Sequence, residues 1–134
     1  ARNDVVFYPN AIETLEILSQ RYALFALTNG NADIYKFDIG KYFRFSISSL
    51  EAKDSKPNRA HFDMAISRVN NISFDNILHI GDHQINDILC AYNLGIDTLW
   101  FNNTNQKWSQ DFQKPEEFSS WKELPKIIEN KYER

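Results

Sequence analysis

Apolar residues recur with two kinds of spacing along this chain. Spacings of i, i+3, i+4 and i+7 are typical of amphipathic helices, whereas short apolar runs or period-two alternation are typical of strands. Helices are predicted over residues 9–18, 31–37, 57–69, 85–92 and 124–128. Strands are predicted over residues 22–27, 43–47, 77–80 and 97–101. The chain therefore begins on a helix and then alternates strands with helices.

This alternation predicts βα units around a parallel sheet, and hence an α/β fold. With 134 residues the chain is long enough for a single hydrophobic core, so we treat residues 1–134 as one domain. Residues 102–120 show neither helical nor strand spacing of apolar residues and are rich in Asn, Gln, Ser and charged side chains. We expect that stretch to be loosely structured.

Composition and charge narrow the functional classes. The net charge is −3 and the basic residues are scattered, which argues against a nucleic-acid groove. The apolar runs are too short to span a membrane, and residues 1–20 show no secretory signal. Cys90 is the only cysteine, which excludes an internal disulfide and a cysteine-rich zinc site. We expect a cytoplasmic location.

Two acids flank the junction between a predicted strand and the next helix. Asp82 follows Gly81 at the end of the apolar run 77–80, and Asp87 comes five residues later. Parallel α/β folds bind ligands at the carboxyl ends of their strands, and Mg²⁺ prefers oxygen ligands. Asp82 is therefore a candidate Mg²⁺ ligand, and Asp87 a candidate partner for a lysine or a ligand water. An acid that complements the helix dipole would also explain Asp87.

Two earlier polar segments stand where strands or loops lead into helices. Thr28-Asn29-Gly30 directly follows a buried strand, so a hydroxyl, an amide and helix N–H groups would converge on a volume that suits a phosphate. An N-cap followed by a turn would use the same residues, and for this segment alone that local interpretation is favoured. Lys56 precedes a proline-started helix, where its ammonium could pair with a phosphate and a carboxylate, although most lysines are simply solvated.

The histidines are weaker candidates. His83 adjoins Asp82 and could contact substrate or metal, but one histidine is not a ligand set. His79 alternates with apolar residues in a predicted strand, and we expect it to be a hydrogen-bonded residue of the sheet. His61 lies beside the apolar face of a predicted helix, and we expect it at the surface or the rim.

Three segments, in this order, closely resemble the motifs of the haloacid dehalogenase superfamily. They are Thr28-Asn29-Gly30, Lys56-Pro57, and Gly81-Asp82 with Asp87. The resemblance covers about residues 9–102 and implies a three-layer, Rossmann-like parallel sheet. It also implies that Thr28 holds the transferring phosphoryl group and that Lys56 offsets charge on the intermediate. By the same resemblance, Asp82 binds Mg²⁺ and Asp87 is the accompanying acid.

The last segment also indicates a branch of that superfamily. The dehalogenase branch typically has Ser-Asn there and no metal-binding aspartate, so Gly81-Asp82 implies the Mg²⁺-dependent phosphatase branch. The segments around Thr28 and Lys56 look most like those of bacterial phosphatases that act on the pyrimidine intermediate of flavin synthesis. His83 departs from the Asp or Ser often found at its position, which leaves the substrate contacts there open.

One part of the superfamily pattern is missing. The nucleophile belongs to a first motif, Asp-x-Asp-x-Thr, at the end of an N-terminal strand, and no Asp-x-Asp occurs in this sequence. The simplest explanation is a C-terminal part of a longer protein, without the first motif, its central strand and the cap. The strands over 22–27 and 77–80 would then flank a gap with unpaired backbone groups. We expect the missing N-terminal part or another copy of the chain to fill it.

The leading hypothesis is therefore a phosphatase. In the intact protein, an aspartate outside this chain would attack the phosphorus of a small phosphorylated metabolite, and water would hydrolyse the aspartyl phosphate. The 134-residue chain alone would be inactive. Two alternatives stay open: a non-catalytic module that binds a phosphate or a partner, and a 2-haloacid dehalogenase-type hydrolase. A receiver-like domain would need its acids early and its lysine last, the reverse of the order here.

Overall fold

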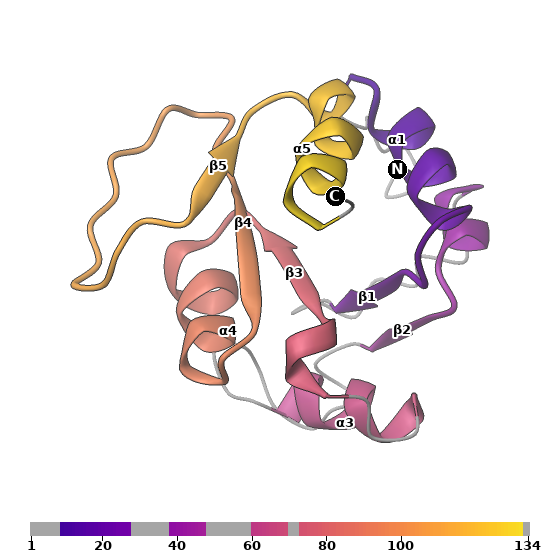
Figure 1. Ribbon diagram of the computed structural model, residues 1–134, viewed down its shortest axis with the longest axis horizontal. Coiled ribbons are helices and arrows are strands. Elements are labelled where there is room, and N and C mark those ends of the chain that lie inside the picture. The colour runs from indigo at the N-terminus through magenta and orange to yellow at the C-terminus, as the bar shows by residue number, and fades with distance from the viewer. Residues whose placement is uncertain (1–8, 28–37, 48–59, 70–72, 133–134) are drawn as a thin grey trace, which may run out of the picture. The chain divides into compact units, whose positions relative to one another are not determined.

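The computed structural model describes residues 9–27, 38–47, 60–69 and 73–132. Figure 1 shows the helices α1 (Ala11–Ser19), α3 (Ala60–Arg68), α4 (Cys90–Asn93) and α5 (Leu124–Tyr132). The strands are β1 (Phe25–Leu27), β2 (Phe45–Ile47), β3 (Leu78–Gly81), β4 (Asp97–Phe101) and β5 (Glu116–Phe118). Short 3₁₀ turns cover Asp38–Tyr42, Phe74–Asn76 and Trp121–Glu123, and a π-helical segment covers Gln84–Leu89. The predicted helix over 31–37 lies outside the described residues.

The described residues divide into two compact units, of which the first contains α1 and α5. α1 contacts α5 and the 3₁₀ turn that precedes it. The Thr14 hydroxyl, itself buried, donates a hydrogen bond of 2.6 Å to the carbonyl oxygen of Trp121. The buried apolar residues of these two helices are Ala11, Leu18, Leu124 and Ile128. The amphipathic helices predicted near the two ends of the chain are therefore confirmed.

The second unit is built on a three-stranded sheet in the order β3-β4-β5. Both ladders are parallel: Ile80 is the partner of Leu99 in the first, and Leu99 is the partner of Glu116 in the second. The helices α3 and α4 belong to the same unit. The parallel α/β fold predicted from the alternation of strands and helices is confirmed.

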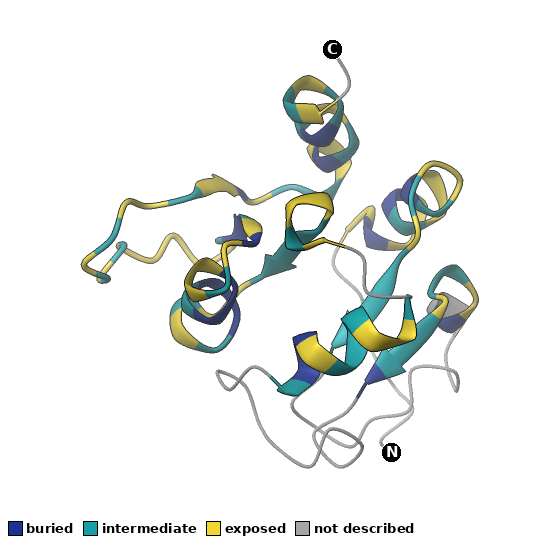
Figure 2. Cartoon of the chain, turned by 60° about the horizontal axis from the view of Figure 1, so that its bottom comes forward, coloured by how far each residue is buried: buried dark blue, intermediate teal, exposed yellow. Residues whose placement is uncertain are grey.

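β4 is the centre of this sheet and its most buried strand. Leu99 and Trp100 have no exposed surface, and Phe101 retains 5%. An apolar cluster in the same unit is formed by Phe62, Cys90, Ala91 and Ile96. Figure 2 shows each helix with buried residues on one side and exposed residues on the other. Burial of these apolar faces, at roughly 25 cal/mol per Å², is the main force that holds the unit together.

β1 and β2 pair in a separate two-stranded sheet. The rings of Phe25 and Phe45 stack across it with their centroids 4.3 Å apart. Among the described residues, β1 and β3, the two strands predicted to flank a missing strand, share no ladder.

Several local predictions were wrong. The stretch 102–120 contains β5, whose first two residues, Glu116 and Glu117, are exposed and so leave no apolar alternation. The helix predicted over 85–92 opens as a π-helical segment, in which the Ile88 N–H donates to the His83 carbonyl five residues back at 3.2 Å. His61, predicted at the surface or the rim, is completely buried. β1 and β2 begin three and two residues later than predicted.

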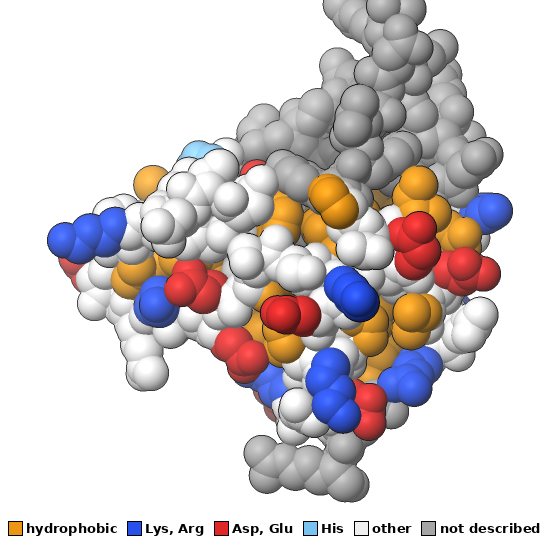
Figure 3. Space-filling model, turned by 90° about the horizontal axis from the view of Figure 1, so that it is seen from above, with side chains coloured by type: hydrophobic (Ala, Val, Ile, Leu, Met, Phe, Trp, Pro, Cys, Tyr) orange, Lys and Arg blue, Asp and Glu red, His pale blue; other side chains and the backbone are white. Residues whose placement is uncertain are grey.

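The surface drawn in Figure 3 mixes acidic and basic side chains, with apolar side chains between them. On this face, the described residues therefore form no continuous basic stripe. Among the described residues, no helix combines the length and the apolar character that a membrane span requires.

Candidate metal and phosphate site

Asp82 lies directly after the carboxyl end of β3 and is exposed. Its main chain is fixed from the neighbouring strand, because the Trp100 indole Nε1–H donates a 2.9 Å hydrogen bond to the Asp82 carbonyl oxygen. Trp100 itself has no exposed surface. Within the described residues the Asp82 carboxylate has no hydrogen-bond or ion-pair partner. Asp82 thus lies at the carboxyl end of a parallel strand, the position predicted from the apolar run before it, with its main chain anchored by Trp100.

Asp87 has the opposite environment. It is only 6% exposed, and its Oδ2 accepts a hydrogen bond of 3.1 Å from the His83 backbone N–H. Its side chain lies against the main chain of Gly81: a Cβ on Gly81 would be 2.5 Å from Asp87 Cγ and 2.6 Å from Oδ2. Gly81 is therefore glycine because the Asp87 carboxylate occupies the space of a side chain. Asp87 thus stabilises the turn over residues 81–87 through its hydrogen bond to His83 and its contact with Gly81.

His83 caps the helix that follows Asp82. Its Nδ1 accepts hydrogen bonds from the backbone N–H groups of Ile85, at 3.2 Å, and Asn86, at 3.0 Å. A ring nitrogen that accepts carries no proton, so the proton of the neutral imidazole is on Nε2. Nδ1 is therefore not available to a metal, whereas Nε2–H remains a donor. The capping role is one that sequence reasoning missed, because histidine is not among the favoured N-caps.

His79 lies in β3, the strand that precedes this turn. Its Nε2 is 3.7 Å from Asp87 Oδ1, too far for a hydrogen bond, and its ring meets Phe62 edge-on with the centroids 4.9 Å apart. Among the described residues Nε2 is buried without a hydrogen-bond partner. The predicted hydrogen-bonded histidine is thus packed instead against an aromatic ring and close to the buried Asp87 carboxylate.

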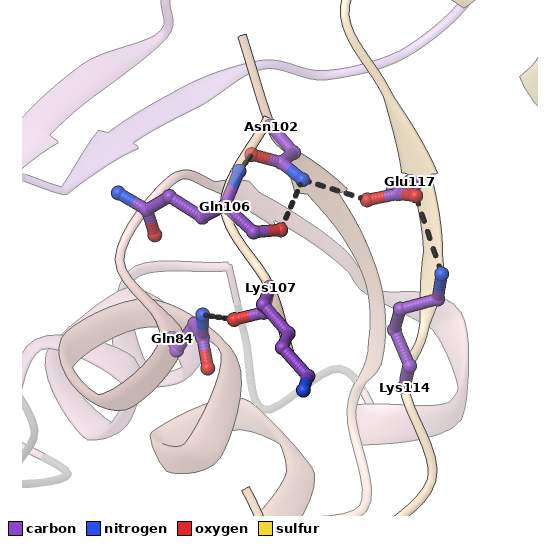
Figure 4. Close-up of polar contacts among 6 residues, drawn as sticks. All are labelled: Gln84, Asn102, Gln106, Lys107, Lys114 and Glu117. Carbon is purple, nitrogen blue, oxygen red and sulfur yellow. Dashed lines mark hydrogen bonds and ion pairs between the residues drawn. The ribbon is translucent and has the colours of Figure 1, made fainter. Parts of the chain in front are cut away.

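A shallow pocket of about 280 Å³ opens beside Asp82. Its wall comes from two segments: residues 82–85 on one side, and Gln106, Ser109 and Gln110 from the β4–β5 loop on the other. Gln84 joins the two, because its Nε2 donates to the Lys107 carbonyl oxygen at 3.0 Å (Figure 4). Its Oε1 accepts from the Ser109 N–H at 3.0 Å and the Ser109 hydroxyl at 2.9 Å. Sequence reasoning missed this loop, since nothing in its composition signals a contact with residue 84.

The base of the same loop is closed by Asn102. Its Oδ1 accepts from the Gln106 N–H at 2.8 Å, and its Nδ2 donates to the Gln106 carbonyl at 3.0 Å and to Glu117 Oε2 at 2.9 Å. Lys114 Nζ is 3.2 Å from the other carboxylate oxygen of Glu117 (Figure 4). The hydrogen bond from Asn102 holds the pKa of Glu117 below its ordinary value, Lys114 adds to this lowering, and desolvation opposes it.

The structure thus brings three predicted site residues together: Asp82, Asp87 and His83. The others, Thr28, Asn29, Gly30 and Lys56, lie outside the described residues. Among the described residues no three His, Cys, Asp or Glu side chains gather as a metal-binding group. One uncommitted carboxylate in a water-accessible turn fits Mg²⁺, which is commonly held by one or two carboxylates, waters and substrate phosphate. Zn²⁺ needs three or four protein ligands, more than gather at one place in the part of the chain that the structure describes.

A parallel α/β fold with a carboxylate presented at the carboxyl edge of its sheet is the Rossmann-like arrangement that holds ligands at that edge. The profile of the haloacid dehalogenase-like hydrolases matches residues 1–101 of this chain. The chain therefore belongs to the haloacid dehalogenase-like hydrolase family, as the order of its motifs predicted.

Its relatives include phosphatases. The chain is 30% identical over 120 residues to 5-amino-6-(5-phospho-D-ribitylamino)uracil phosphatase YigB of Escherichia coli. This match covers 87% of this chain and 50% of that protein. It is 26% identical over 125 residues to pyrimidine 5′-nucleotidase YjjG of the same organism, covering 90% of this chain and 56% of that one. The chain thus spans about half the length of these curated relatives.

Solved structures confirm the fold. A 2-haloacid dehalogenase from Pseudomonas syringae superimposes with a TM-score of 0.90 at 30% identity, over 96% of this chain and 56% of that one. The HAD-hydrolase YfnB from Bacillus subtilis, described as bound to magnesium, gives a TM-score of 0.83 at 23% identity, over 90% and 55%. The predicted Rossmann-like fold is therefore confirmed.

Proposed function

We propose that the protein containing this chain is a Mg²⁺-dependent phosphatase that hydrolyses a small phosphomonoester. The observation that carries the proposal is the contrast between the two acids. Asp87 is buried and bonded within the turn, whereas Asp82 is exposed, has no side-chain partner among the described residues and is held at its main chain by Trp100. A free carboxylate held in place at a sheet edge is what a metal-assisted phosphoryl transfer needs, and what a metal-free dehalogenase does not.

The residues divide the work as follows. Asp82 would hold Mg²⁺, which when bound neutralises negative charge on the phosphoryl oxygens. Thr28, with the N–H groups at Asn29 and Gly30, would bind those oxygens. Lys56 would neutralise charge on the same group and pair with Asp87.

The covalent step needs a residue from outside this chain. An aspartate would attack phosphorus and form an aspartyl phosphate as the alcohol leaves, and water would then cleave the acyl phosphate to release inorganic phosphate. We propose that this aspartate is supplied by a segment that precedes the chain in the same protein, or by a partner. The 134-residue chain is therefore expected to be inactive by itself.

The names of the relatives suggest the substrate class. One is a phosphatase of a phosphoribitylamino uracil and another a pyrimidine 5′-nucleotidase. We propose a small phosphorylated metabolite of this kind for the present protein. Neither a nucleic acid nor a membrane is part of the proposal, and the expected location is the cytoplasm.

A second candidate, hydrolysis of a carbon–halogen bond, is favoured by the resemblance to the Pseudomonas syringae structure named as a 2-haloacid dehalogenase. One experiment separates the two. The protein as encoded by its gene is incubated with p-nitrophenyl phosphate or with 2-chloropropionate, each with Mg²⁺ and with EDTA. The proposal expects phosphate release that EDTA abolishes and no chloride release. Chloride release that is insensitive to EDTA, without phosphate release, would establish the dehalogenase instead.

A further inference from the structure

His79 is a largely buried residue to which the proposed function assigns no role. Its side chain is 11% exposed, and its Nε2 is buried without a hydrogen-bond partner among the described residues. Buried polar atoms nearly always have a partner, so this one needs a physical explanation. The acceptor that faces it is Asp87 Oδ1, at 3.7 Å, on a side chain that is 8% exposed. Water therefore competes little for the contact between the two residues.

The contact with Asp87 determines which ring nitrogen of His79 carries the proton. An unprotonated Nε2 would turn its lone pair toward a carboxylate oxygen, and two acceptors repel each other. Nε2 therefore carries a proton. A shift of about 0.5 Å would bring it to 3.2 Å from Asp87 Oδ1, the upper end of ordinary N–H···O hydrogen bonds. The ring packs edge-on against the buried Phe62, with the centroids 4.9 Å apart, which limits its freedom to turn away.

Asp87 links this contact to the turn over residues 81–87. Its Oδ2 accepts from the His83 N–H at 3.1 Å, and its side chain fills the space that a Cβ on Gly81 would need. Asp87 thus touches the main chain on both sides of Asp82. The terminal torsion of a carboxylate is soft, so a donor at one oxygen leaves its plane free to turn, whereas donors at both oxygens fix it. His79 stands where it can supply the donor at Oδ1.

From this arrangement we propose that His79 is a positioning residue for the metal ligand: its Nε2–H orients the Asp87 carboxylate, and Asp87 in turn fixes the main chain around Asp82. The inference rests on the proposed Mg²⁺-dependent function, because it concerns how firmly Asp82 is placed for the ion. In this role His79 contacts neither the ion nor the substrate. Its loss should therefore weaken Mg²⁺ binding without abolishing it, since Asp82 itself is retained.

Two substitutions separate the donor of His79 from the bulk of its ring. His79→Leu keeps an apolar side chain and removes the N–H, whereas His79→Gln offers an amide N–H at about the reach of Nε2. The Kd for Mg²⁺ is measured by isothermal titration calorimetry on the protein as encoded by its gene, so the result does not depend on turnover. His79→Leu should raise this Kd about fivefold, the effect of one hydrogen bond, and His79→Gln should stay within about twofold of the wild type.

Thr98→Val is the matched control. Thr98 is the partner of His79 in the β3–β4 ladder, and its hydroxyl forms no hydrogen bond among the described residues. Valine keeps the branched shape of the side chain, so this variant should leave the Kd for Mg²⁺ unchanged. Urea midpoints are measured in parallel. If His79 served only the packing of the sheet, His79→Leu would lower the midpoint and leave the Kd at the wild-type value, and the inference would be wrong.

The remaining outcomes are equally decisive. An equal rise of the Kd in His79→Leu and His79→Gln would overturn the role of the Nε2 donor. Should His79→Leu fail to fold, a long-range proton–nitrogen NMR spectrum of the wild type still tests the inference, which expects the proton on Nε2 and is overturned by a proton on Nδ1 alone. A wild type that binds Mg²⁺ while His79→Leu binds it equally well would overturn the inference and leave the proposed function standing. A wild type that binds no Mg²⁺ would overturn the proposed function and the inference with it.

Discussion

Replacing Gly81 by alanine tests the geometry that holds the candidate site together. The added Cβ would be 2.6 Å from Asp87 Oδ2, about 0.8 Å short of the 3.4 Å at which ordinary contact begins. The Asp87 carboxylate must therefore withdraw, and its hydrogen bond to the His83 N–H breaks. Overpacking costs about 1–3 kcal/mol and a lost hydrogen bond to a charged group about 1.5–3 kcal/mol. Since the two overlap, we expect Gly81→Ala to lower the free energy of unfolding by about 3 kcal/mol.

Urea denaturation of the protein as encoded by its gene measures this change. With a slope of about 2 kcal/mol per M, the midpoint should fall by about 1.5 M. Gly95→Ala is the control: a Cβ there meets nothing within 4 Å, but φ is +77°, so only backbone strain of about 1–2 kcal/mol is expected. If Gly81→Ala cost no more than Gly95→Ala, the Asp87 side chain would not lie against Gly81, and the described turn would be wrong.

Two further predictions concern hydrogen bonds around the site. Trp100→Phe keeps an aromatic ring but removes the N–H bonded to the Asp82 carbonyl, so it should lower the free energy of unfolding by about 2 kcal/mol in the same assay; a change under about 0.5 kcal/mol would refute that anchor. Because the folded-state pKa of Glu117 is lowered by Asn102, the stability that this bond contributes is present above the unfolded-state pKa and is lost as the pH falls through the folded one. The destabilisation caused by Asn102→Ala should therefore be smaller at about pH 3 than near neutral pH, and an equal or larger effect in acid would contradict the pairing.

The helices and strands could be predicted from the sequence where the buried residues are also the ones that recur with helical or strand spacing. Leu99, Trp100 and Phe101 are apolar because they are buried in β4, the middle strand of its sheet, and the strand predicted over 97–101 has these bounds in the structure. Gly95 follows the helix α4 with a φ of +77°, and hydrogen bonds run from Gly95 N–H to the Tyr92 carbonyl and from Ile96 N–H to the Ala91 carbonyl. Glycine is favoured in this arrangement, so it marks a helix end that a sequence can reveal.

Other features leave no trace in the pattern of residues. β5 is three residues long, and two of them are exposed glutamates, so its sequence shows no alternation of apolar and polar residues. The π-helical opening after His83 keeps the same apolar spacing as an α-helix but shifts a hydrogen bond by one residue, which composition cannot reveal. His61 is completely buried although it stands beside the apolar face of its helix.

The candidate site could be predicted only in part, because some of its features are local in sequence and others are not. A strand end is a local feature, so Asp82 could be placed from the apolar run that precedes it. The division of labour between Asp82 and Asp87 could not, because it depends on the contact of Asp87 with Gly81 and on the hydrogen bond from Trp100. Nor could the pocket wall, which depends on contacts between Gln84 and residues more than twenty positions away. Interactions that distant in sequence have no periodic signature.

The most direct test of the central claim is the Mg²⁺ dependence of phosphate release when Asp82 is changed. In the protein as encoded by its gene, Asp82→Asn should lower Mg²⁺-dependent kcat/KM for a phosphomonoester by about 100-fold or more, since an uncharged amide cannot replace the carboxylate. Asp75→Asn, a change at an exposed aspartate away from the pocket, should leave it unaffected. Phosphate release that persists in Asp82→Asn at the wild-type rate, with the same dependence on Mg²⁺, would contradict the role of Asp82 as the metal ligand.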